Sequence, residues 1–177
     1  MKQMTGTRVG AVMTLVILGG ALLGACAPMA GPAGAAANRA VPLLAGDGKA
    51  IGEIAVATDG SMRVRVMVGA FAPGVHGMHL HETGLCTGPG FTSAGAHWNT
   101  SGKQHGKDNP LGAHLGDLPN IEIGANGGEA RIAAVGTLLA DGDGTALVIH
   151  AKADDYKSDP SGDSGDRIAC AVIAPAR

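Results

Sequence analysis

Short apolar runs separated by turn-forming residues recur along most of this chain, and they constrain its fold more than any other feature. In the run 62–69, apolar residues alternate with arginines, which is the period of a strand with one buried face. The Asp59-Gly60 pair before it is a hairpin signal. Further runs of this kind are 41–44, 51–57, 120–123, 130–135, 145–151 and 168–173. About eight short strands without an amphipathic helix predict an all-β, Greek-key antiparallel sandwich or flattened barrel.

Two stretches interrupt this rhythm of strands and turns. Residues 82–117 and 152–166 are long, rich in glycine and weakly apolar. Loops of such length in a compact domain usually carry function. We therefore expect the functional site to lie in these two loops and at the strand ends beside them.

The histidines are concentrated in the same part of the sequence. All seven lie between His76 and His150. His79 and His81 are two residues apart in a strand-like segment, so both imidazoles project from one face of the strand. The other candidate metal ligands follow along the chain: His97, His105, His114, Asp117 and His150.

This donor set suits two different metals. Three histidines and one aspartate complete a tetrahedral zinc site and leave no position for water. Imidazoles without a thiolate also suit copper. Seven side chains cannot form two separate four-coordinate sites, so one ligand must be shared. The set therefore predicts a paired metal site with a bridging imidazole.

The first 26 residues differ in character from the rest of the chain. Lys2 and Arg8 precede an apolar stretch, residues 9–23, that has the length of a signal-peptide core rather than of a membrane span. It ends in Leu-Leu-Gly-Ala before Cys26, which looks like a lipobox. We expect a signal peptide of the lipoprotein type over 1–25, a lipidated Cys26 opening a flexible Ala/Gly/Pro tether over 26–40, and one domain over 41–177. An ordinary signal peptide and an uncleaved anchor helix are the alternatives.

Charge and cysteine content narrow the class of protein further. Without the leader the chain has 11 basic and 15 acidic residues, so it offers no basic field for nucleic acid. Three cysteines are an odd number for an exported protein. If Cys26 carries lipid, an even number remains in a compartment where disulfides persist.

Five segments together resemble, in order, the signature motifs of copper/zinc superoxide dismutases. The resemblance extends from about residue 41 to the end of the chain, and its motifs have matched internal spacing. The segments are GVHGMHLH (74–81), SAGAHWN (93–99), AHLGDL (113–118), LVIHAKADD (147–155) and GDRIAC (165–170).

The resemblance implies a role for each matched position. Copper ligands fall on His79, His81, His97 and His150. Zinc ligands fall on His97, His105, His114 and Asp117, so His97 is the bridge.

Five further positions match residues that support such a centre. Asp154 corresponds to a carboxylate that hydrogen-bonds one copper histidine and one zinc histidine, and His76 to a buried hydrogen-bonding histidine. Arg167 corresponds to the guanidinium that guides and holds the anion beside copper. Cys86 and Cys170 correspond to the intrasubunit disulfide, with two free thiols as the alternative.

The activity implied is dismutation of superoxide to oxygen and hydrogen peroxide, with copper as the redox ion. The resemblance also implies that His97 would release copper and take up a proton in the first half of the cycle. A noncatalytic metal-binding or copper-delivery module is the alternative, and a plain structural sandwich is a third.

The expected location is the periplasm or cell envelope, with the lipid anchor as the only membrane contact and the outer membrane favoured. The sequence leaves open whether the protein is a monomer or a homodimer. It also leaves open whether Lys152 or Lys157 steers the substrate.

Overall fold

A computed structural model describes residues 39–133 and 142–177, which belong to one compact unit, Gly34–Arg177. These residues form strands and one short 3-10 helix, η1 (Thr92–Ala94). The strands are β1 (Arg39–Ala45), β2 (Ala50–Val56), β3 (Met62–Val66), β4 (Gly74–His76), β5 (Met78–His81), β6 (Ile121–Ile123), β7 (Gly128–Ile132), β8 (Thr145–His150) and β9 (Arg167–Ala174).

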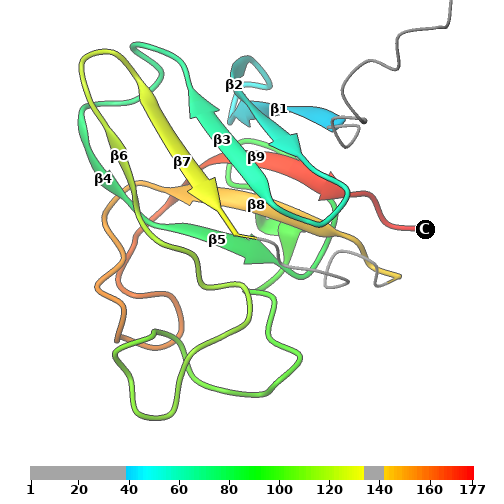
Figure 1. The fold of residues 1–177 in the computed structure, drawn as a ribbon, viewed down its shortest axis with the longest axis vertical. Coiled ribbons are helices and arrows are strands. Elements are labelled where there is room, and N and C mark those ends of the chain that lie inside the picture. The colour runs from blue at the N-terminus through cyan, green and yellow to red at the C-terminus, as the bar shows by residue number, and fades with distance from the viewer. Residues whose placement is uncertain (1–38, 134–141) are drawn as a thin grey trace, which may run out of the picture. The chain divides into compact units, whose positions relative to one another are not determined.

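Seven of the strands form one antiparallel sheet in the order β5-β8-β9-β1-β2-β3-β7, and β4 pairs with β6. Strands distant in sequence are neighbours in this sheet, since β1 lies beside β9 and β3 beside β7, as Figure 1 shows. The sheet curls, and the predicted all-β fold is confirmed. The loop after β5 and the loop after β8 lie side by side below the sheet in the figure.

The strand boundaries differ from the expected ones by a few residues. β1 begins at Arg39, two residues before the predicted start, because Arg39 and Ala40 pair with β2. β3 ends at Val66 because a turn follows, in which Gly69 adopts a left-handed φ of 72° and the Ala70 amide donates to Met67. The short strand β4 was not predicted separately.

Alternation of side chains along the strands builds the core. In β3 the side chains of Met62, Val64 and Val66 are buried and the two arginines between them are exposed, as the period of two predicts. Leu43, Ile54, Leu147 and Ile173 are among the fully buried residues that meet them from other strands. Burying such a side chain contributes about 1.5–3 kcal/mol, so this core sets the register of the sheet.

Several predictions concern residues that the structure does not describe. The signal peptide, Cys26 and nearly all of the tether lie outside the described residues, as do positions 134 and 135 of the strand predicted over 130–135. Within 39–133 and 142–177, no helix is long and apolar enough to cross a membrane.

Candidate metal centre

Strand β5 is the platform on which the histidine cluster is built. His79 and His81 project from one face of it, and Met78 and Leu80 pack into the core from the other. The Leu80 backbone binds the first long loop at two points: its amide donates to Gly116 O (2.8 Å) and its carbonyl accepts from the Trp98 amide (2.8 Å). These bonds place His97 and Asp117, the neighbours of those loop residues, against β5.

Gly116 is required for this close approach of loop and strand. A Cβ at this position would lie 2.4 Å from Leu80 O, well inside van der Waals contact. A glycine in the loop therefore lets two backbones meet where two predicted ligands converge.

One group of donors consists of four buried histidines. One ligand atom from each of His79, His81, His97 and His150 lies within 4.8 Å of the others. Each has a buried ring nitrogen without a hydrogen-bond partner among the described residues: Nδ1 of His79 and Nε2 of the other three. Buried polar atoms are almost always paired, so four converging bare nitrogens indicate a site for a metal ion.

Hydrogen bonds at the opposite ring nitrogens fix which atoms face the centre. His81 and His150 donate from Nδ1 to the carbonyls of Gly95 and Gly165, each at 3.0 Å. His79 donates from Nε2 to Asp154 Oδ2 at 2.9 Å. A neutral imidazole that donates from one nitrogen presents a lone pair at the other, so the three rings are pre-set as metal ligands.

Burial also keeps these imidazoles uncharged. It lowers the pKa of His79 to about 3, that of His81 to about 2 and that of His150 to about 4. Burial lowers the pKa of His97 as well, against the opposing effect of Asp117. Because a metal ligand must be deprotonated, four neutral rings at pH 7 bind without first losing a proton.

A second group of donors surrounds Asp117. Its Oδ1 lies 3.1 Å from His97 Nδ1, 2.9 Å from His105 Nδ1 and 3.2 Å from His114 Nδ1. Its Oδ2 accepts from the backbone amides of Gly106 and His114, which orients the carboxylate. Burial raises the pKa of Asp117, but hydrogen bonds from His105 and His97 outweigh it and leave the carboxyl ionised.

The two groups meet at His97. Its Nε2 faces the four-histidine group, while its Nδ1 lies 3.4 Å from His114 Nδ1. A ligand atom of His79 lies within 4.8 Å of one from each of His97, His105 and Asp117. His114 is not in that set and joins the second group through Asp117 Oδ1, 3.2 Å from its Nδ1. His79 is close to both groups because the two groups are adjacent. Only its Nδ1 lacks a hydrogen-bond partner, so it can serve as a ligand in one group only. The structure thus gathers every predicted ligand into one cluster, with His97 facing both halves.

Asp154 joins the two halves from outside. Its Oδ2 accepts from His79 Nε2 at 2.9 Å, and its Oδ1 accepts from His105 Nε2 at 3.0 Å. Burial opposes ionisation of Asp154, but the bonds from His105 and His79 hold its pKa well below the usual range. Burial likewise disfavours charge on His105, yet Asp117 and Asp154 raise the pKa of His105 to about 9. Asp154 therefore sets the orientation of one imidazole in each half.

Asp154→Asn is expected to weaken metal binding by about 10–100-fold, the usual cost of losing a partner that orients a ligand. An amide accepts at one atom only, so either His79 or His105 would face an NH₂ group. Titration against a competing chelator measures the loss. Asp163→Asn is the matched control, because Asp163 is exposed and its left-handed φ of 48° suits asparagine. Equal affinity of both variants would contradict this role of Asp154.

A hollow of about 550 Å³ opens over the cluster between the two long loops. His97, His114, His150 and Arg167 line it, together with Lys103. Arg167 is fixed by hydrogen bonds from Nη1 to Phe91 O (2.9 Å) and from Nη2 to Gly95 O (2.7 Å). Gly95 O thus accepts from both Arg167 and His81. A positive side chain held beside bare metal-site nitrogens suits a small anionic substrate.

Three other predicted residues lie beside the cluster rather than in it. His76 is buried and donates from Nδ1 to His150 O at 2.8 Å, as expected for a hydrogen-bonding rather than a ligating histidine. Cys86 and Cys170 form a disulfide that ties the first long loop to β9.

Sequence reasoning missed some residues that shape the site. Asn120 binds the Asp154 backbone twice, donating from Nδ2 to its carbonyl and accepting from its amide, each at 2.9 Å. Neither Lys152 nor Lys157 lines the hollow, whereas Lys103 does. No local pattern marks Asn120, because it acts on a segment distant in sequence, and none marks Lys103.

Comparison with known proteins places the chain in a family. Residues 50–173 match the family described as copper/zinc superoxide dismutase (SODC). A superoxide dismutase-like protein of Bacillus subtilis is 41% identical over 145 residues, covering 75% of this chain and 74% of the relative. A Cu-Zn superoxide dismutase of Caulobacter vibrioides is 38% identical over 141 residues, covering 73% and 81%.

A solved structure has a fold similar to that of this chain. The crystal structure of a SOD-like protein from Bacillus subtilis superposes with a TM-score of 0.69 at 39% identity, covering 77% of this chain and 99% of that one. The match extends through β2 to β9 and through both loops that hold the donor atoms. The chain therefore belongs to the copper/zinc superoxide dismutase family, whose metals are copper and zinc.

Proposed function

We propose that this protein dismutates superoxide to oxygen and hydrogen peroxide. The observation that carries the proposal is the convergence of four bare imidazole nitrogens beside an arginine fixed in an open hollow. The copper ligands are His79, His81, His97 and His150. The zinc ligands are His97, His105, His114 and Asp117.

Each residue of the site has a definite task in this proposal. Copper, when bound, supplies one-electron oxidation and reduction, which zinc cannot do. Arg167 attracts and holds the anion, and the carbonyls of Phe91 and Gly95 keep its guanidinium in place. His97 would take up a proton at Nε2 in the first half of the cycle, while that nitrogen is not a copper ligand. Asp154 fixes the rings of His79 and His105, so the donors need little rearrangement.

Metal reconstitution combined with a superoxide assay tests the proposal directly. The purified protein should take up one copper and one zinc and should then consume superoxide catalytically. A fully loaded protein without turnover would contradict the enzyme assignment. That result would favour the alternative of a metal-binding or copper-delivery module. The Bacillus subtilis relative is described only as superoxide dismutase-like, which is why this alternative is tested.

Lys103→Gln is expected to lower kcat/KM by about tenfold at low ionic strength, since charge in a cleft raises encounter rates by 10–10³. Lys103 lines the hollow over the cluster, where Glu82 and Asp159 oppose its charge. Lys157→Gln removes the same charge from the same pair of loops but outside the hollow. Stopped-flow rates against salt concentration should show a weaker dependence for the first variant only. Equal slopes for both variants would exclude steering by Lys103.

We further propose that the mature protein is lipid-anchored at Cys26 in the cell envelope. The Leu-Leu-Gly-Ala-Cys sequence supports this, and the Cys86–Cys170 disulfide is typical of proteins outside the cytoplasm. Mass spectrometry of the mature N-terminal peptide should find a diacylated cysteine. A free Cys26 or a chain still starting at Met1 would contradict the anchor.

A further inference from the structure

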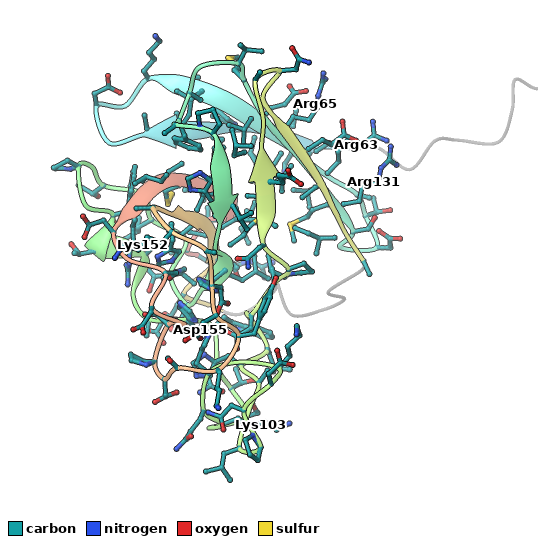
Figure 2. All side chains as sticks on the ribbon, turned by 90° about the vertical axis from the view of Figure 1, so that its left-hand side faces the viewer. Arg63, Arg65, Lys103, Arg131, Lys152 and Asp155 are labelled. Carbon is teal, nitrogen blue, oxygen red and sulfur yellow. A yellow bond between two sulfur atoms is a disulfide. The ribbon has the colours of Figure 1, made fainter. Side chains whose placement is uncertain are left out.

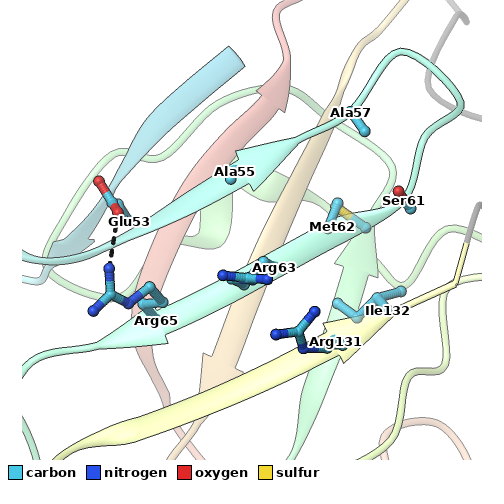
Figure 3. A pocket seen from close by; sticks show the side chains of 9 residues that line it. All are labelled: Glu53, Ala55, Ala57, Ser61, Met62, Arg63, Arg65, Arg131 and Ile132. Carbon is cyan, nitrogen blue, oxygen red and sulfur yellow. Dashed lines mark ion pairs between the residues drawn. The ribbon is translucent and has the colours of Figure 1, made fainter. Parts of the chain in front are cut away.

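A second hollow, of about 480 Å³, lies on the outer face of the sheet. Figure 3 shows three arginines from β3 and β7 projecting from this face. In Figure 2 they lie together at one end of the domain, while Lys103 lies at the other end. The lining residues are Glu53, Ala55, Ala57, Ser61, Met62, Arg63, Arg65, Arg131 and Ile132, none of which lines the hollow over the metal centre.

Strand register arranges the charges of this face in two cross-strand rows. In the first, Arg65 lies between Glu53 and Glu129, so positive charge stands between two negative ones. In the second, Arg63 lies between Ala55 and Arg131. Like charges directly opposite each other destabilise a sheet. The second row therefore costs stability unless something negative occupies it.

The acidic neighbours only partly compensate for the arginines. Glu129 lies 3.6 Å from Arg63, 4.0 Å from Arg65 and 3.5 Å from Arg131, and Glu53 lies 3.6 Å from Arg65 (Figure 3). All four distances are too long for good hydrogen bonds. Among the described residues, no hydrogen bond engages the guanidinium groups of these arginines. The mature chain is acidic overall, with 11 basic and 15 acidic residues, so this positive face is a local exception.

The chemistry of the hollow suits a phosphate group. Paired guanidinium groups bind phosphate oxygens bidentately, and Ala55 and Ala57 leave space between the strands. Apolar surface adjoins the cations, since Met67 next to Arg65 has 57% of its surface exposed and Val68 has 67%. Surfaces that bind a lipid headgroup layer typically combine cations with exposed apolar side chains.

The N-terminal end of the domain favours a membrane over a soluble ligand. Ala40 pairs with Ala55, so the chain joins the sheet in the row that contains Arg63 and Arg131. The twelve residues between Cys26 and Arg39 reach about 40 Å at full extension. We propose that the face formed by Arg63, Arg65 and Arg131 docks on the phosphate headgroups of anionic phospholipids in the membrane that holds the anchor. The proposal rests on lipidation of Cys26 and is independent of dismutase activity.

Vesicle binding of the mature chain, residues 26–177 with Cys26→Ser, tests this docking without the lipid. The protein should sediment with phosphatidylcholine vesicles that contain phosphatidylglycerol and not with pure phosphatidylcholine. Arg63→Gln with Arg131→Gln should lower the partition coefficient about 30-fold, the effect of two cations near an anionic surface. Added salt should weaken binding of the unsubstituted protein.

Lys107→Gln with Lys157→Gln is the matched control, because it removes the same charge from exposed residues in the loops at the other end of the domain. This control should retain binding, and the arginine variant should melt at or above the temperature of the parent, because it removes the facing like charges. An unchanged partition coefficient for the arginine variant would overturn the proposal, as would an equal loss in the lysine variant.

Inorganic phosphate distinguishes a headgroup from a soluble ligand. At constant ionic strength, we expect it not to displace the protein from anionic vesicles. Displacement would identify a soluble phosphate compound as the ligand and would overturn membrane docking. Superoxide turnover of the arginine variant should equal that of the parent, so failure of docking and failure of the enzyme assignment are separate results.

Discussion

Replacing His150 by alanine is expected to abolish superoxide turnover and to remove copper while zinc stays bound. His150 contributes one of four converging bare nitrogens, and none of the atoms gathered around Asp117 belongs to it. Loss of a residue that only orients a ligand costs 10–100-fold in affinity, so losing the ligand itself should cost more than about 100-fold. Metal analysis after dialysis and a superoxide assay at equal protein concentration measure both effects.

His76→Gln is the control for this prediction. His76 is a buried histidine that contacts the His150 backbone, yet it is not among the converging donors. Its replacement should lower thermal stability and leave copper binding stoichiometric. If both variants lost copper to the same extent, disruption of the structure at the C-terminal end of β8 would explain the result. The assignment of His150 as a ligand would then fail.

Removal of the Cys86–Cys170 disulfide is expected to destabilise the metal-free protein by about 4.5 kcal/mol. The bond closes a loop with a sequence separation of 84, so its loss restores much conformational entropy to the unfolded chain. For a domain of this size the midpoint of thermal unfolding should fall by about 10 °C or more. Urea unfolding of the parent and of Cys86→Ala with Cys170→Ala measures the difference.

The metal-free state is necessary here because bound copper and zinc stabilise the folded protein by mass action and would obscure the effect. Reductant should destabilise the parent to the level of the variant and leave the variant unchanged. A variant as stable as the oxidised parent would show that the disulfide does not constrain the unfolded chain.

Part of the fold follows from local sequence because strands such as β3 obey a period of two, whereas β8 is buried at every position. The alternation in β3 predicts which side chains are buried, and the spacing of His79 and His81 predicts a shared face. Strand ends were less predictable. β1 gains Arg39 and Ala40 through pairing with β2, which no local property of those residues indicates.

The resemblance predicts the ligands and the role of Asp154, but the sequence does not show which of their atoms meet. Asp154 and its two partners lie on separate segments, with sequence separations of 75 to His79 and 49 to His105, and only the fold brings them together. Asn120 has no recognisable pattern for the same reason. The positive face likewise depends on cross-strand register, because Arg63 and Arg131 become neighbours only when β3 pairs with β7.

The carbonyl oxygen of Gly95 accepts hydrogen bonds from both His81 and Arg167. One backbone atom therefore sets the position of the His81 ring and of Arg167, the group that we propose receives the anion. A Cβ at this position would lie 2.7 Å from Glu82 Cγ, and the φ of 76° excludes most side chains. Attempts to redesign the protein for larger anions by shifting Arg167 would thus disturb His81 as well. New specificity would have to come from the walls of the hollow, at Lys103 or Asp159, and not from the arginine.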